Sequence, residues 1–123
     1  MVHQQTEQIS DNGTQAQKFE IVSNGDGYYY ILTGASNYTR AVDIENGSAA
    51  DGTNVIQWDY WGGTMQMYKI VKNSDGSFAF LTRASNEKSA LEVYEISKDA
   101  GANVDQWTYF GGNWQHWKLT ETN

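Results

Sequence analysis

The sequence predicts an all-β domain, and three observations lead to this fold class. Aromatic residues are abundant, with five Trp, eight Tyr and four Phe, and β-strands favour such side chains. Twelve glycines indicate many tight turns between short strands. The chain also repeats itself at a spacing of 49 residues, and no convincing amphipathic helical pattern interrupts the repeat. The 123 residues are enough for one domain with one core.

The internal repeat organises the chain. When the sequence is shifted by 49 residues, residues 19–70 align with 68–119 without a gap, and 22 of the 52 pairs are identical. The best stretch aligns NVIQWDYWGGTMQMYKI (54–70) with NVDQWTYFGGNWQHWKL (103–119). Because chance would give only a few identities, the repeat predicts two copies of one supersecondary unit.

A third copy is present only in part. The same shift finds weak matches before residue 19, without the tryptophan of the other copies. We therefore predict a single domain over 1–123, with repeats at about 19–67 and 68–117 and a partial repeat at 1–18. A threefold barrel of about twelve strands would need about three copies, so this chain has fewer than that architecture requires.

Four strands are predicted in each full copy. The turns NGDG (24–27) and NSDG (73–76) supply glycines for positive φ between the first and second strands of each copy. Alternation of apolar and polar side chains indicates the strands that follow. The strands are expected at 19–23, 28–33, 40–44 and 54–60, and again 49 residues later, including 78–82, 89–93 and 103–109.

Charge and composition narrow the choice of partner. The net charge of −7 disfavours a duplex nucleic acid or an anionic membrane surface, so we expect a neutral partner, no nucleic acid and no membrane insertion. No apolar run approaches the roughly 18 residues that span a bilayer. The polar N-terminus lacks the apolar stretch of a signal peptide, so a signal either was removed or never existed.

The ends of the repeats carry a short motif. It reads QHW at 115–117, QMY at 66–68 and QKF at 17–19. This motif resembles the QxW signature of ricin B-type lectins, which are carbohydrate-binding modules of β-trefoil fold, and the residues before it look like the bacterial branch of that family. The resemblance covers about residues 17–119. It implies a β-trefoil with two full 49-residue repeats plus a partial third lobe.

The motif itself is interpreted as structural. A Gln amide is able to bond the backbone of a neighbouring turn, and the aromatic residue two positions later points the same way, into the core. We expect this arrangement for Gln66 with Tyr68 and for Gln115 with Trp117.

The resemblance also implies one shallow sugar site per full repeat. In the first repeat it assigns the sugar-binding carboxylate to Asp43, the stacking ring to Trp58 and a further contact to Trp61. Carboxylates accept strong hydrogen bonds from sugar hydroxyls, and aromatic faces suit the C–H groups of a pyranose. Ile56 and Met65 stand where the family usually has polar side chains.

In the second repeat the corresponding residues are Glu92, Asp105, Trp107, Phe110 and Trp114. Both sites then carry more aromatic surface than a standard galactose site. We therefore expect binding of a polysaccharide or an extended glycan, through aromatic stacking plus carboxylate hydrogen bonds. The partial third copy is expected to have no site.

Structural roles remain open for four of these residues. Trp58 and Trp107 could be core aromatics, and Asp43 and Glu92 could bond a neighbouring turn. Exposed aromatic side chains as numerous as those around the Gly-Gly turns more often mark a contact surface.

Catalytic chemistry is not indicated. The chain has no cysteine, no Gly-x-Ser-x-Gly elbow and no cluster with metal-ligand spacing, so we expect no enzyme activity, no cofactor and no metal. A glycosidase remains a minor alternative, although Asp43 and Glu92 are expected in different lobes.

Two further expectations concern context. The family resemblance favours a secreted module that is one part of a larger polysaccharide-degrading enzyme. An open third lobe would expose unpaired strand edges, so the lobe is expected to be partial, absent from this chain, or completed by another copy in a homo-oligomer. The main alternative function is a β-trefoil that binds a protein, such as a protease inhibitor, through the loops 45–53 and 94–102.

Overall fold

The fold is all-β, as the sequence predicts. The computed structural model describes residues 2–3, 18–93 and 104–121. The strands in the two full repeats agree with the predicted ranges to within one residue at each end. The strands are β1 (Val2–His3), β2 (Lys18–Ser23), β3 (Tyr29–Thr33), β4 (Arg40–Ile44), β5 (Thr53–Asp59), β6 (Tyr68–Lys72), β7 (Phe78–Thr82), β8 (Ser89–Val93), β9 (Val104–Thr108) and β10 (Thr120–Glu121).

Short 3₁₀ turns join several strands, and the sequence patterns did not indicate them. They are η2 (Gly34–Ser36), η3 (Glu45–Gly47), η4 (Thr64–Gln66), η5 (Arg83–Ser85) and η7 (Asn113–Gln115). Within the described part of the chain, no helix is long and apolar enough to cross a membrane.

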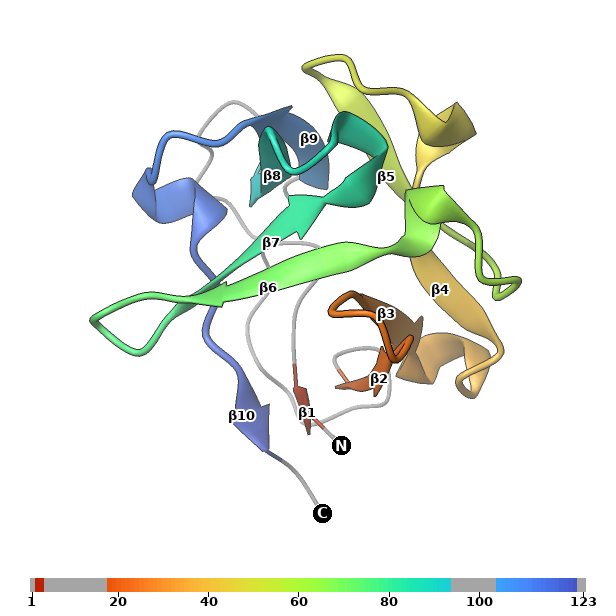
Figure 1. Cartoon of the computed structure of the whole chain (residues 1–123). Coiled ribbons are helices and arrows are strands. Elements are labelled where there is room, and N and C mark those ends of the chain that lie inside the picture. Colours follow the sequence, from red (N-terminus) through yellow and green to blue (C-terminus); the bar gives the residue numbers. More distant parts are fainter. Residues whose placement is uncertain (1, 4–17, 94–103, 122–123) are drawn as a thin grey trace.

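Seven of the strands close into a ring. Their order is β3–β4–β5–β9–β8–β7–β6, and β6 pairs back with β3 at Tyr68 and Tyr29. Every pairing in the sheet is antiparallel. Figure 1 shows the β4–β5 pair and the β8–β9 pair on different sides of the molecule. The ring therefore presents the fourth strand of each repeat in a different direction.

The register of the sheet repeats at the same spacing as the sequence. Phe19 faces Thr33 between β2 and β3, and Tyr68 faces Thr82 between β6 and β7. The β4–β5 and β8–β9 pairs are equivalent in the same way. Residues 4–17 lie outside the described residues, so the partial third lobe stays a prediction.

A polar network explains why Thr, Ser and Gln recur in both repeats. The Thr33 hydroxyl donates to Gln57 Oε1 at 2.6 Å, and Ser36 Oγ donates to the Thr33 carbonyl at 2.9 Å. In the second repeat, Thr82 and Gln106 form the equivalent bond. The network ties the end of the second strand to the fourth strand of the same repeat, which fixes the strand that carries the candidate site.

The core lies inside the ring, and the predicted structural motif contributes to it. Tyr68 is fully buried and its hydroxyl donates to the Val42 carbonyl at 3.0 Å. Trp117 is buried too, and its Nε1 donates to the Leu91 carbonyl at 3.2 Å. The two aromatic residues thus occupy equivalent places and bond equivalent carbonyls, which confirms their structural interpretation. The other members of the core are Phe19, Ile31, Val42, Ile44, Phe80, Leu91, Val93 and Val104.

Candidate ligand-binding sites

A pocket of about 400 Å³ opens between β4, β5 and the turns η3 and η4 of the first repeat. It brings together all three residues that the sequence assigned to this site. The lining residues are Asp43, Glu45, Asn46, Ile56, Trp58, Trp61 and Met65.

Asp43 is the buried carboxyl group of this pocket. It lies on β4, opposite Ile56 of β5, and it is almost completely buried. Its Oδ2 accepts a hydrogen bond from Gln66 Nε2 at 3.0 Å, so it does bond a neighbouring turn. Burial raises the pKa of the Asp43 carboxyl, and the Gln66 bond partly offsets that rise. A carboxylate offers about four acceptor positions, so this bond leaves capacity for ligand hydroxyls.

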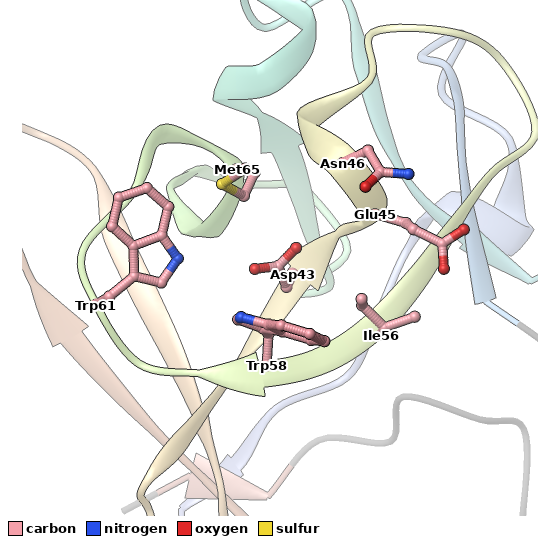
Figure 2. A pocket seen from close by; sticks show the side chains of 7 residues that line it. All are labelled: Asp43, Glu45, Asn46, Ile56, Trp58, Trp61 and Met65. Carbon is pink, nitrogen blue, oxygen red and sulfur yellow. The ribbon is translucent and has the colours of Figure 1, made fainter.

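Two tryptophans flank the carboxylate, as Figure 2 shows. Trp58 is 59% exposed and Trp61 is 62% exposed. The alternative that Trp58 is a core aromatic is therefore wrong. Cross-strand pairing places the small Ala41 opposite Trp58, which leaves the indole free of a bulky neighbour on the paired strand.

The Gly-Gly pair after β5 shapes the turn that carries Trp61. Gly62 has a φ of +81°, which favours glycine. Gly63 has an ordinary φ, but a Cβ on it would lie only 2.2 Å from the Trp61 ring. The first glycine is thus required by the backbone and the second by the close approach of the indole.

Gln66 connects the turn that carries Trp61 to the buried Asp43 carboxyl group of the pocket. Its side chain is fully buried. Its Oε1 accepts from the backbone N–H groups of Trp61 and Gly62, and its Nε2 donates to the Asp59 carbonyl as well as to Asp43. The predicted role of this Gln, bonding the backbone of a neighbouring turn, is confirmed. The same side chain therefore positions both the turn with Trp61 and the carboxylate.

The second repeat has two carboxyl groups where the first has one. Glu92 of β8 faces Asp105 of β9, and both are buried, at 5% and 1% exposure. Gln115 Nε2 donates to Glu92 Oε1 at 3.3 Å and to the Thr108 carbonyl at 2.9 Å. Asp105 Oδ1 is buried without a hydrogen-bond partner among the described residues.

Burial is the main reason why this pair stays partly protonated. Burial, then the negative charge of Asp105, raises the pKa of Glu92 to about 7. Burial also raises the pKa of Asp105 to about 6, and the charge of Asp51 adds to the rise. Two carboxyl groups so close together do not ionise independently, so the pair holds a proton near neutral pH.

The aromatic part of the second site is also exposed. Trp107 is 41% exposed and Phe110 is 58% exposed, so Trp107 is not a core residue either. Trp114 is half-buried, and its ring lies 5.4 Å from that of Phe110, between ring centroids. A Cβ on Gly112 would lie 2.7 Å from Phe110, which repeats the close approach seen at Gly63.

Sequence reasoning missed two lining residues of the first pocket. Glu45 and Asn46 belong to η3, directly after Asp43 on the chain. Asn46 has a φ of +56°, a conformation that Asn adopts more readily than most residues. The sequence feature that could have identified these two residues is therefore the turn directly after β4. The corresponding residues 94–96 of the second repeat lie outside the described residues.

The described residues contain no group of three His, Cys, Asp or Glu side chains that could hold a metal ion. His116 lies beside the Tyr109 hydroxyl, with its Nε2 at 3.2 Å. What the two sites offer is a carboxyl group beside exposed aromatic rings, which suits a ligand with hydroxyl groups and an apolar face.

Comparison with known proteins agrees with this description. The model of the family described as ricin-type β-trefoil lectin domain-like matches residues 2–58 and 41–107. No curated protein sequence matches the chain.

Solved structures of similar fold include designed, enzymatic and lectin examples. ThreeFoil, a designed threefold-symmetric protein, is 38% identical over 93% of this chain and 79% of its own, with a TM-score of 0.85. An exo-β-1,3-galactanase from Clostridium thermocellum is 33% identical over 92% of this chain but only 24% of its own, with a TM-score of 0.83. A ricin B-like lectin from Macrolepiota procera, solved with lactose, is 15% identical over 93% of this chain and 77% of its own, with a TM-score of 0.76, and shares the fold.

Proposed function

Because the chain belongs to the ricin-type β-trefoil lectin family, we propose that it is a non-catalytic carbohydrate-binding module. The observation that carries this proposal is the first-repeat pocket. There the Asp43 carboxylate lies beside the exposed ring of Trp58, and a pyranose needs both an acceptor for its hydroxyls and a flat apolar surface.

The proposed ligand is a polysaccharide or an extended glycan. Apolar side chains, Ile56, Trp61 and Met65, line the first pocket at positions that the family often fills with polar residues. Such a surface favours contact with several sugar rings over hydrogen bonding of one. The similarity to a β-1,3-galactanase supports β-1,3-galactan as the first probe.

Both repeats contribute a site in this proposal. The first uses Asp43, Trp58 and Trp61, and the second uses the residues Glu92, Asp105, Trp107, Phe110 and Trp114. Two sites on one body raise the avidity for a polymer without improving either site.

The cellular context is proposed on the same basis. We infer a secreted module within a larger polysaccharide-degrading protein, and the short share of the galactanase that this chain covers supports that arrangement. The net charge of −7 disfavours nucleic acid as a partner. Completion of the third lobe by a second copy of the chain is proposed as well, and sedimentation analysis would test it.

The test is a glycan array together with soluble and insoluble polysaccharides, including β-1,3-galactan. Trp58→Ala and Trp107→Ala are each expected to lower binding roughly 30-fold at their own site, because aromatic anchors dominate such contacts. Tyr28→Ala is a matched control, since Tyr28 is an aromatic residue that lies under Arg83 rather than in either site.

Unchanged far-ultraviolet circular dichroism would show that the variants remain folded. If the folded wild type binds no glycan, the proposal fails, and a protein partner reached through the loops 45–53 and 94–102 becomes the better hypothesis. The second of these loops lies outside the described residues.

A further inference from the structure

One segment of the first repeat reaches both sites. It begins at Glu45 and Asn46, which line the first pocket. Near its other end is Gly52, where a Cβ would lie 3.8 Å from the six-membered ring of Trp107 in the second site. We name residues 45–53 the shared segment. Its two ends belong to two different candidate sites.

The C-terminal half of the shared segment is bonded firmly to β9. Gly52 N donates to the Gln106 carbonyl at 2.7 Å. Gln106 Nε2 donates in return to the carbonyls of Ser48 and Ala50, at 2.8 and 3.1 Å. Gln106 is fully buried as a result, whereas its equivalent in the first repeat, Gln57, is exposed.

Asp51 bonds the residue that follows Trp107 on β9. Its Oδ1 accepts from the backbone N–H of Thr108 at 2.7 Å and from the Thr108 hydroxyl at 2.9 Å. Thr108 directly follows Trp107 on β9. A carboxylate that holds the next residue by its backbone restricts the orientation of the Trp107 side chain.

Asp51 also acts on the two buried carboxyl groups of this site. Its negative charge raises the pKa of both Glu92 and Asp105. The remaining groups that act on this pair are the two carboxyls themselves and the Gln115 amide. Asp51 is thus the only charged group from the first repeat, among the described residues, that contributes to these two shifts.

We propose that Asp51, supplied by the first repeat, is a positioning residue of the second sugar site, so that this site is completed across the boundary between the repeats. The proposal rests on the proposed function of Trp107. Asp51 is not among the residues that line the first pocket, to which the shared segment contributes Glu45 and Asn46 from its other end.

The binding test isolates the second site in the Trp58→Ala background, with a β-1,3-galacto-oligosaccharide as the probe in calorimetric titration. Adding Asp51→Ala is expected to lower the remaining affinity about tenfold, equivalent to about 1.4 kcal/mol. Asp26→Asn removes the same charge from the exposed turn between β2 and β3 and is expected to change nothing. An affinity within twofold of the parent after Asp51→Ala would overturn the proposal.

A second test needs no ligand. In Asp51→Asn, which keeps the shape of the side chain, nuclear magnetic resonance is expected to show a lowered titration midpoint of Glu92 and a shifted Trp107 indole N–H resonance. A role limited to stability would move neither. If the oligosaccharide fails to bind the wild type, the proposed function fails for that ligand, and these two resonances still decide the role of Asp51. Unchanged resonances would overturn it.

Discussion

The first-repeat pocket and the second-repeat site lie on equivalent strands in the same register, but they differ in the residue that faces the carboxyl group. Ile56 faces Asp43 in the first repeat, and Asp105 faces Glu92 in the second. The stacking tryptophan and the Gln behind the turn are retained in both. The residue that faces the carboxyl group on the fourth strand thus adds a second acidic side chain to the second site, while the strand register stays the same.

The consequence of this difference is chemical. Asp43 has no second carboxyl group opposite it on β5, and as a carboxylate that receives the Gln66 bond it only accepts hydrogen bonds. The Glu92–Asp105 pair, with a pKa of about 7 on Glu92, holds a proton near neutral pH and is able to donate one as well. Two sites built on the same strands are thus expected to differ in the hydrogen-bonding groups that they recognise.

The largest effect is expected from the Gln that each site shares with its turn. Gln66→Ala removes bonds to two backbone N–H groups, one carbonyl and Asp43, all near a fully buried side chain. We expect it to lower the free energy of unfolding by about 3 kcal/mol, because buried partners are left unsatisfied. Urea denaturation measures this change in the free energy of unfolding.

Gln115→Ala is the matched variant, with fewer bonds to lose. It is expected to cost less than Gln66→Ala. An equal or larger cost would show that the additional bond from the Gly62 N–H to Gln66 contributes nothing to the stability of the first repeat.

A glycine variant tests the role of the flanking aromatic ring. In Gly63→Ala the new Cβ would meet the Trp61 ring at 2.2 Å, so the indole must move. We expect the first-site affinity for β-1,3-galacto-oligosaccharide to fall about tenfold in the Trp107→Ala background. Calorimetric titration measures it. Gly112→Ala, which crowds Phe110, is expected to leave the first site unchanged, and a loss there would refute the independence of the two rings.

Exchanging the residue that faces the carboxyl group tests whether this residue causes the difference between the two sites. Ile56→Asp places a carboxyl group opposite Asp43 and is expected to raise the pKa of Asp43 further, by repulsion. Like charges opposite each other in a sheet cost about 1 kcal/mol, so stability at pH 8 is expected to fall by that amount. The reciprocal Asp105→Asn is expected to lower the pKa of Glu92. Carboxyl titration followed by nuclear magnetic resonance measures the pKa of Asp43 and of Glu92 in these variants.

The last prediction concerns the pH dependence of the free energy of unfolding. Glu92 has a pKa of about 7 in the folded chain and an ordinary value of 4.5, so the folded state binds more protons between these values. Stability is then expected to rise as the pH falls from about 7 to 4.5. The melting temperature is expected to be higher at pH 5 than at pH 8. Glu92→Gln is expected to flatten this profile, and a profile that the variant leaves unchanged would contradict the assignment to Glu92.

Much of the fold could be predicted from the sequence, because the repeat aligns the strands β2–β5 with their counterparts β6–β9, although it did not indicate β1 and β10. The spacing of 49 residues located the strands, the Gly-Gly turns and the buried role of Tyr68 and Trp117. Local patterns of glycine and alternating side chains depend only on neighbouring residues, so a sequence retains them.

The parts that could not be predicted depend on contacts between distant segments. Nothing near Asp51 in the sequence indicates that its carboxylate reaches Thr108 in the other repeat. Likewise, the Glu92–Asp105 pair depends on the register of β8 against β9.

The exact repetition of register has a consequence for folding kinetics. Ile70 of β6 faces Phe80 of β7, and Ile21 of β2 is its equivalent. β2 is therefore able to pair with β7 in the same register as its native partner β3. The native pairing closes only the turn 24–28, whereas the slipped pairing closes residues 24–77, which costs about 2 kcal/mol more in chain entropy. A short turn thus selects the native hairpin, and a long insertion at Gly25 would favour slipped and strand-exchanged species during refolding.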